Sequence, residues 1–211
     1  MLRMGNHTQE KQLRMIKAVL TQLSILMLLT SMTSCQNNGF STRYGIFDVK
    51  NDSTITMNGV IGGRTDNHFN NLVKNHTNIK WIELGHCPGS KNDEVNLVVA
   101  KQMYDLGMST KVSSVSEIAS GAVDLFLAGN ERIVQSGAKI GVHSWAGGNK
   151  VPTELKVDAI EHELYINYYK SVGMTDSAAR EFYFFTINSA AANDIHWMTP
   201  EEIKYFDMAT D

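Results

Sequence analysis

A serine in the middle of the chain lies in a context where it could act as a catalytic nucleophile. Ser120 lies in a run of small and apolar residues, 118–128, that predicts a helix directly after a strand. Free N–H groups and the helix dipole favour an anion near the start of such a helix, and Gly121 leaves room for a substrate to approach. Ser120 is therefore a candidate nucleophile, although a serine taken alone at this position is more often a simple N-cap.

A histidine follows at the end of the next apolar segment. His143 comes directly after Ile140, Gly141 and Val142, a pattern typical of a strand. The end of a rigid strand is a place where a general base can be held, although a lone histidine there is usually structural. The G-x-S-x-G motif of α/β-hydrolases is absent, which disfavours that fold.

Strands that alternate with helices must position these residues. Alternating and β-branched patterns predict strands at 54–61, 79–84 and 110–115, with one or two more within 132–142 and an edge segment within 40–51. Helices are predicted at 68–74, 93–106, 118–128, 153–172 and 175–187, and Asn92 or Asp93 would cap the second of them. Thr199 and Glu202 form a capping-box pattern for a last helix. This order predicts an α/β layer architecture.

The two motifs and a third one together resemble the ClpP peptidases. Residues 118–129 resemble the nucleophile helix of that family, and the strand ending at His143 resembles the one that carries its catalytic histidine. Asp194 precedes a segment, residues 199–205, that is similar to the family's S/T-A/P-E-E/A-x-x-Y frame. The resemblance covers about 55–207 and is nearest to small exported ClpP-like proteins. It implies a single α/β domain with a ClpP/crotonase-like stacked β-sheet core and surrounding helices.

The resemblance also implies roles for individual residues. Ser120 would attack a carbonyl, His143 would take and return its proton, and Asp194 would orient the imidazole. Backbone N–H groups of Gly121, Gly89 and Ser90 would form the oxyanion hole.

Three positions depart from the family pattern. The turn that is usually Ser-Pro-Gly-Gly is Cys87-Pro88-Gly89-Ser90 here, and Ser90 would be strained if this position needed a positive φ. Asp124 lies one turn after Ser120 and is expected to face solvent, pair with a cation or disturb the site. Phe206-Asp207 replaces a glycine after Tyr205.

Other residue types suggest alternatives. Lys111 or Lys139 could serve as the base in place of His143, as the related SppA group implies. Cys87 is either a reactive thiol in the cleft or a buried inert one, and His86 and His196 lie near the expected site. The run 161–163, Glu-His-Glu, lacks the second histidine of a zinc motif, so no metal and no other cofactor is expected. The aromatic run 182–185 is expected to pack a helix or an oligomer interface.

The first 35 residues resemble a bacterial lipoprotein signal peptide. Basic residues precede a Leu-rich run, 18–32, which is short for a bilayer span. Residues 32–34 then lead into Cys35 in a lipobox-like context. We therefore expect a signal at 1–35 with lipid on Cys35, a tether at 36–51 and the ClpP-like domain at 52–211. The protein would face the periplasm from a lipid anchor in the cell envelope. A short transmembrane anchor is the alternative, and Met15 is an alternative start.

Composition limits the classes of function. A net charge of −3 with no basic stripe excludes a nucleic-acid partner. The leading interpretation is an exported, lipid-anchored serine hydrolase that cleaves peptides or unfolded proteins, and the family resemblance implies a homo-oligomer. A catalytically inactive binding or scaffold protein is the second hypothesis, and acyl-CoA chemistry is the third.

Overall fold

A mixed β-sheet of eight strands carries the segments of interest in a computed structural model that describes residues 42–147 and 150–210. Its order is β1-β2-β3-β4-β5-β7-β8, and β6 pairs with β5 off this path. The strands β3, β4, β5, β6 and β7 run parallel, while β1, β2 and β8 are joined antiparallel at the edges. The bounds are β1 Arg43–Tyr44, β2 Phe47–Asn51, β3 Thr54–Met57, β4 Trp81–Cys87, β5 Ser109–Ala119, β6 Arg132–Val134, β7 Lys139–Val142 and β8 His196–Trp197.

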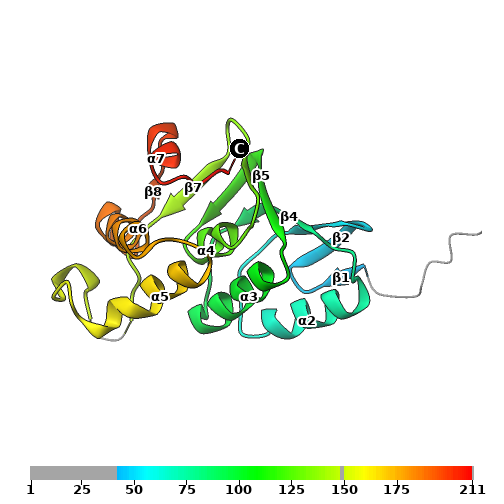
Figure 1. Ribbon diagram of the computed structural model, residues 1–211, viewed down its shortest axis with the longest axis horizontal. Helices are drawn as coiled ribbons and strands as arrows, with labels where there is room; N and C mark the ends of the chain where they lie inside the picture. The colour runs from blue at the N-terminus through cyan, green and yellow to red at the C-terminus, as the bar shows by residue number, and fades with distance from the viewer. Residues whose placement is uncertain (1–41, 148–149, 211) are drawn as a thin grey trace, which may run out of the picture. The chain divides into compact units, whose positions relative to one another are not determined.

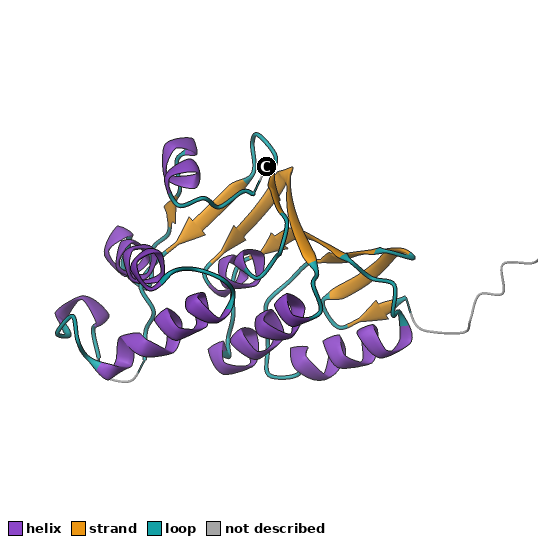
Figure 2. Cartoon of the chain, in the orientation of Figure 1, coloured by secondary structure: helices purple, strands orange, loops and turns teal. Residues whose placement is uncertain are grey.

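Helices gather along one face of this sheet, and α7 lies near β8 (Figures 1 and 2). Contacts join α2 to α3, α3 to α4 and α5, and α5 to α6. The bounds are α2 Thr65–Asn75, α3 Asp93–Asp105, α4 Gly121–Leu127, α5 Glu163–Ser171, α6 Asp176–Ser189 and α7 Pro200–Tyr205, with 3-10 helices at Pro152–Glu154 and Ile160–His162. The predicted α/β fold is confirmed.

Polar side chains cap three helices, α3, α6 and α7, whose starts the sequence predicted. The Asn92 side chain accepts a hydrogen bond from the Val95 N–H and caps α3, which decides between the two expected caps. Thr199 and Glu202 form the capping box of α7, and Thr175 caps α6. Each cap satisfies N–H groups that a helix start leaves without an intrahelical partner.

The long strand β5 changes partners along its length. Its first half pairs with β6 and its last residues pair with β7, while β4 borders both halves. The register between β4 and β5 shifts after Leu84, and Ser116 bridges the irregularity by donating to the Leu84 carbonyl at 2.7 Å. Because the strand continues past this break, it reaches Ser120 at its carboxyl end.

Two expectations about elements were wrong, and a third was met. Residues 118–119 belong to β5, since Ile118 pairs with Cys87 and Ile140, so sheet pairing replaces the first turn of the predicted helix. The helix expected at 153–172 begins only at Glu163, because the preceding stretch lacks an apolar face to bury: Val157 is 70% exposed and Ile160 78%. The edge segment expected within 40–51 is present as β1 and β2, and Phe47 is fully buried.

The expected signal peptide and Cys35 lie outside the described residues. Within 42–147 and 150–210, no helix is long and apolar enough to cross a membrane.

Candidate active site

Ser120 occupies the sharp junction between β5 and α4. Its backbone has φ 54° and ψ −132°, a region that non-glycine residues rarely adopt and that costs on the order of 1–3 kcal/mol. The position is that of an N-cap, yet the hydroxyl makes no capping hydrogen bond. Its N–H donates to the Gly141 carbonyl at 3.0 Å, which ties the junction to β7. Strain of this kind clusters at functional sites, where the surrounding structure imposes it.

The turn after β4 lies directly against this serine. A Cβ atom on Gly89 would come within 2.8 Å of the Ser120 Cβ, and Gly89 has φ +128°. The positive φ falls on Gly89 and not on Ser90, so the departure from the Ser-Pro-Gly-Gly pattern brings no strain. Across the site, a Cβ on Gly121 would lie 2.7 Å from the Ser90 Oγ. Neighbouring atoms thus leave no room for a side chain at either position, which explains why both residues are glycine.

Backbone N–H groups at this turn are available to an incoming oxygen. Among the residues that the structure describes, the N–H groups of Ser90 and Gly121 have no hydrogen-bond partner. Ser90, Ser120 and Gly121 all line one pocket. Two free donors next to a nucleophile are what an oxyanion hole requires, and buried N–H groups are otherwise nearly always paired.

His143 lies just beyond the end of β7 and lines the same pocket, whose volume is about 190 Å³. Its Nδ1 lies 2.8 Å from the Ser144 carbonyl oxygen. A carbonyl can only accept, so Nδ1 carries the proton and Nε2 is left as the acceptor. This is the tautomer that a general base needs.

Asp194, the third candidate, is not brought to His143 in this conformation. Its carboxylate accepts a hydrogen bond from the Ile195 N–H at 2.8 Å, the residue is exposed, and it does not line the pocket. Ala192, two residues earlier, does. Ser120 and His143 therefore line one pocket, and Asp194 does not.

Two carboxyl groups that the sequence analysis did not assign to substrate contact also line the pocket, Asp93 and Asp124. Asp124 is buried, and its oxygens accept hydrogen bonds from Tyr169 Oη at 2.9 Å and Asn96 Nδ2 at 3.3 Å. Burial first, and then the charge of Asp93, raise the pKa of Asp124 to about 7, against the lowering effect of Tyr169. Asp124 is thus not exposed to solvent, and no cation pairs with it among the described residues, so two of its expected environments are absent. Its spacing from Ser120, one helical turn, was the signal that placed it beside the site.

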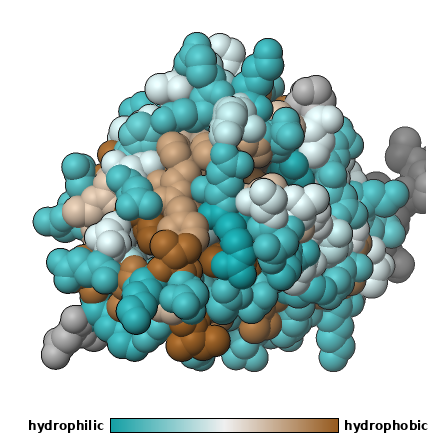
Figure 3. Space-filling view, turned by 60° about the vertical axis from the view of Figure 1, so that its left-hand side comes forward, coloured by the Kyte–Doolittle hydropathy of each residue, from teal (hydrophilic) through white to brown (hydrophobic). Residues whose placement is uncertain are grey.

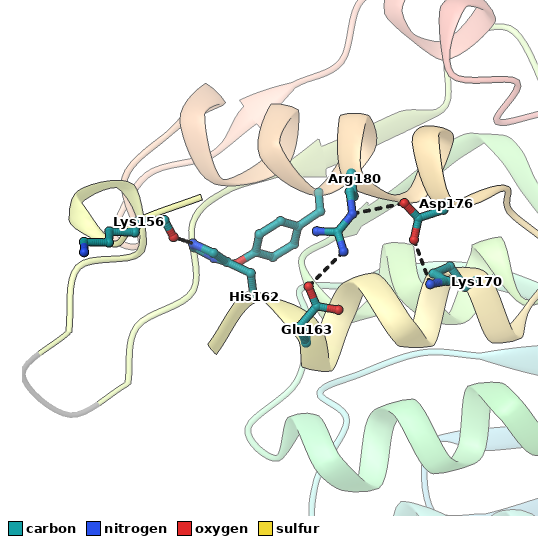
Figure 4. Close-up of polar contacts among 7 residues, drawn as sticks. Lys156, His162, Glu163, Lys170, Asp176 and Arg180 are labelled. Atoms are coloured by element: carbon teal, nitrogen blue, oxygen red, sulfur yellow. Dashed lines mark hydrogen bonds and ion pairs between the residues drawn. The ribbon is translucent and has the colours of Figure 1, made fainter. Parts of the chain in front are cut away.

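The far wall of the pocket is formed by α5, α6 and the segment after His143. Trp145 Nε1 donates to Tyr183 Oη at 2.9 Å, and Tyr183 Oη lies 2.7 Å from His162 Nδ1. His162 Nε2 in turn lies 3.0 Å from the Lys156 carbonyl, so it is the donor there (Figure 4). In this network, which includes the buried His162, each group donates to the next from Trp145 to the Lys156 carbonyl. The network fixes the Trp145 and Tyr183 rings at the pocket.

Ion pairs hold α5 and α6 together outside this wall. Arg180 bridges Glu163 at 3.0 Å and Asp176 at 3.1 Å, and Lys170 reaches the same Asp176 at 2.7 Å (Figure 4). Pairs this exposed contribute little each, but a network orients the two helices. Buried contacts among aromatic rings, such as Phe182 with Tyr169 and with Phe206, pack the same helix, as the run 182–185 predicted.

The remaining sequence candidates lie elsewhere. Cys87 is fully buried and donates to the Met57 carbonyl, and burial raises the pKa of its thiol to about 11, so it is the inert alternative. Lys139 pairs with Glu117, and neither it nor Lys111 lines the pocket. The described part of the chain holds no group of three His, Cys, Asp or Glu side chains suited to a metal.

Two histidines near the expected site make structural contacts. His196 contacts Glu202 at 2.8 Å, and His86 lies 4.0 Å from Glu117 at the surface. Neither lines the pocket.

No protein-family model matches the chain, and no curated protein matches its sequence. Its structure is similar to those of known proteases. Two variants of the membrane-bound stomatin-specific protease 1510-N, one of them in complex with a substrate peptide, are each 16% identical to this chain. They match over 75% of this chain and 76% and 72% of theirs, with TM-scores of 0.48 and 0.50. A ClpP1 variant from Listeria monocytogenes is 15% identical over 75% of this chain and 89% of that one, with a TM-score of 0.49. The chain has a ClpP-like fold.

Proposed function

We propose that this chain is a serine peptidase of ClpP-like fold. The observation that carries the proposal is the strained backbone of Ser120, φ 54°, in a pocket that also holds His143 and two unpartnered N–H groups. Strain at a serine that makes no capping bond has no role in stability, and it aims the hydroxyl at the pocket. The same fold in 1510-N, one structure of which holds a substrate peptide, supports peptides as the substrate class.

The proposed reaction uses groups that line this pocket. Ser120 Oγ attacks the carbonyl carbon of the scissile peptide bond while Nε2 of His143 takes its proton, and the carbonyl oxygen becomes an oxyanion. The N–H groups of Ser90 and Gly121 donate to this oxyanion. His143 then protonates the leaving amine, and water hydrolyses the acyl-enzyme by the same steps in reverse.

The third position of the triad is divided between two groups in this proposal. The Ser144 carbonyl, 2.8 Å from His143 Nδ1, fixes the tautomer. Asp194 stabilises the imidazolium that forms during attack, and it needs a rearrangement of the loop beyond Ala192 to make contact. The proposal uses Ser90 and Gly121 as donors because both line the pocket, and it assigns to Gly89 the close approach of the turn to Ser120.

A fluorophosphonate probe read by intact mass tests the proposal. Wild-type protein should gain one adduct, and Ser120→Ala and His143→Ala should gain none. Ser114→Ala removes an exposed serine of β5 outside the pocket and is the matched control, which should label like wild type. A folded wild-type protein that takes no adduct would contradict the proposal and favour a binding or scaffold protein instead.

Location and assembly complete the proposal. The protein is exported and anchored in the bacterial envelope by lipid on Cys35, so Cys35→Ser should release it from membranes and abolish incorporation of labelled palmitate.

It forms a homo-oligomer through apolar surface, which Figure 3 shows on the side of α5 and α6. Val98 and Leu164, each 51% exposed, line a groove between α3 and α5. Val98→Asp should dissociate the assembly in sedimentation velocity.

A further inference from the structure

The pocket beside Ser120 is acidic. Asp93 and Asp124 both line it, and no lysine or arginine does. The Asp93 carboxylate accepts hydrogen bonds from the hydroxyls of Ser90 and Tyr165, the latter at 2.6 Å. Asp124 is held by Tyr169 and Asn96. All of these donors are neutral, so the negative charge of the pocket is solvated by dipoles and has no counter-ion among the residues that line the site.

Two buried polar side chains at the site, Asn96 and Thr186, have unused hydrogen-bonding capacity. Asn96 is fully buried, and its Nδ2 donates to the Gly121 carbonyl at 2.9 Å and to Asp124. Its Oδ1 has no partner among the described residues, and neither does the buried Oγ1 of Thr186, which lines the pocket. A buried acceptor without a donor costs on the order of 1–3 kcal/mol. The Thr186 hydroxyl is thus free to hydrogen-bond a ligand in the pocket.

Aromatic rings supply the remaining walls. Trp145, Tyr165, Tyr169, Phe182 and Tyr183 line the pocket, and the hydrogen bond to Tyr183 fixes the Trp145 ring. Ring faces attract cations, by as much as about 2 kcal/mol when the contact is desolvated. Carboxylates, the free hydroxyl of Thr186 and aromatic walls in one cavity favour the same class of ligand.

We infer that this pocket binds the side chain of lysine or arginine at the residue whose carbonyl Ser120 attacks. The inference rests on the proposed function, because it identifies the bound residue as the one whose carbonyl carbon Ser120 attacks. Asp93 is the specificity-determining residue: it lines the pocket beside Ser90, whose N–H would hold the same carbonyl. The ammonium or guanidinium group contacts Asp93, and the aliphatic stem packs on the rings.

Binding without turnover tests this inference separately from catalysis. The full chain carrying Ser120→Ala is titrated by calorimetry with two acetylated peptides that differ only in a C-terminal lysine amide or norleucine amide. Norleucine has the same unbranched stem without the ammonium group. The lysine peptide should bind about tenfold more tightly or better, as one desolvated cation contact gives.

Two further variants in that background locate the charge. Asp93→Asn should bring the lysine preference to within about twofold, because the full negative charge is lost while the helix cap at Asn92 stays. Glu94→Gln, the matched control, removes the same charge from the next residue of α3, which is exposed and outside the pocket, and it should keep the preference. A lysine peptide that binds no better than norleucine, or no binding of either, overturns the inference even if Asp93→Asn fails to fold. Fluorophosphonate labelling of wild type reports on the proposed function independently.

Discussion

The backbone of Gly89 runs directly against the side chain of Ser120: a Cβ at position 89 would lie 2.8 Å from the Ser120 Cβ. The turn after β4 and the junction after β5 thus touch at the atoms that the proposed reaction uses. No side chain fits between them, so the distance between the oxyanion donors and the nucleophile is set by backbone alone.

Gly89→Ala should therefore abolish labelling of Ser120 and destabilise the fold. The new methyl group clashes with Ser120 and sits at φ +128°, which L-residues rarely adopt; we expect a loss of about 2 kcal/mol in the free energy of unfolding. Gly62→Ala is the control, because a Cβ at position 62 would meet nothing within 4 Å. Urea titration and probe labelling measure both effects, and a variant that labels normally would refute the close-contact argument.

The strain at Ser120 predicts that two substitutions of this residue differ in stability. Ser120→Gly and Ser120→Ala both remove the hydroxyl, but only glycine is at ease at φ 54°. We expect Ser120→Gly to be the more stable of the two by about 1 kcal/mol in denaturant unfolding. Equal stabilities would show that the backbone is unstrained in solution.

His143 and Asp194 should differ in how much activity they carry. Because Nδ1 of His143 already donates to the Ser144 carbonyl, Asp194→Asn leaves the tautomer in place. Its kcat/KM should fall less than that of His143→Ala, which removes the base altogether and should cost about 10⁴-fold or more. Losses of the same size in the two variants would mean that Asp194 orients the imidazole directly.

Asp124 makes stability depend on pH. Its pKa rises from 3.8, the ordinary value of an aspartate side chain, to about 7 in the fold, so between these values the folded state binds more protons than the unfolded one. The contribution of Asp124 to stability is most favourable below roughly pH 4 and falls by about 1.4 kcal/mol per pH unit as the pH rises towards 7. The titratable groups that interact with Asp124 are Asp93 and the hydroxyls of Tyr165, Tyr168 and Tyr169, and the neutral amide of Asn96 also donates to its carboxyl group.

Replacing this carboxyl should remove that dependence. Asp124→Asn should unfold at a higher urea concentration than wild type at pH 8, and the difference should vanish near pH 4. The exposed Asp105→Asn of α3 is a control for net charge. A constant difference across the range would exclude Asp124 as the titrating group.

Cys87 should be unreactive in the folded protein. Its thiol is fully buried, and burial raises its pKa to about 11, so little thiolate exists at neutral pH. In a Cys35→Ser background Cys87 is the single thiol. Alkylation by iodoacetamide should then proceed no faster than unfolding and be complete within minutes in denaturant. Rapid modification under native conditions would place the thiol in the cleft.

The sequence was informative wherever function depends on the ends of neighbouring strands. Ser120 and His143 follow β5 and β7, which pair in parallel, so their shared edge of the sheet follows from the order of elements. Their chemical roles stay predictions. Asp194 lies on a loop, and no local pattern fixes where a loop carboxylate points.

The acidic character of the pocket could not be predicted in the same way. Asp124 is buried by Tyr168 and Tyr169, which lie more than 40 residues later in the chain and reach it only through packing of α5 on α4 and α3. The sequence patterns of α5 were misleading too, since a helix was expected from 153 and begins at Glu163. Long-range contacts of this kind leave no periodic signal.

The hydrogen bond from Trp145 to Tyr183 gives the pocket an intrinsic optical readout. Trp145 is one of three tryptophans, and its indole both lines the cavity and donates to the network that ends at the Lys156 carbonyl. Indole emission shifts with the polarity and hydrogen bonding around the ring, so binding of a ligand in the pocket should shift the emission maximum of Trp145. With Trp81 and Trp197 replaced by phenylalanine, substrate analogues can be titrated without labels, and the molecule itself reports when its site is filled.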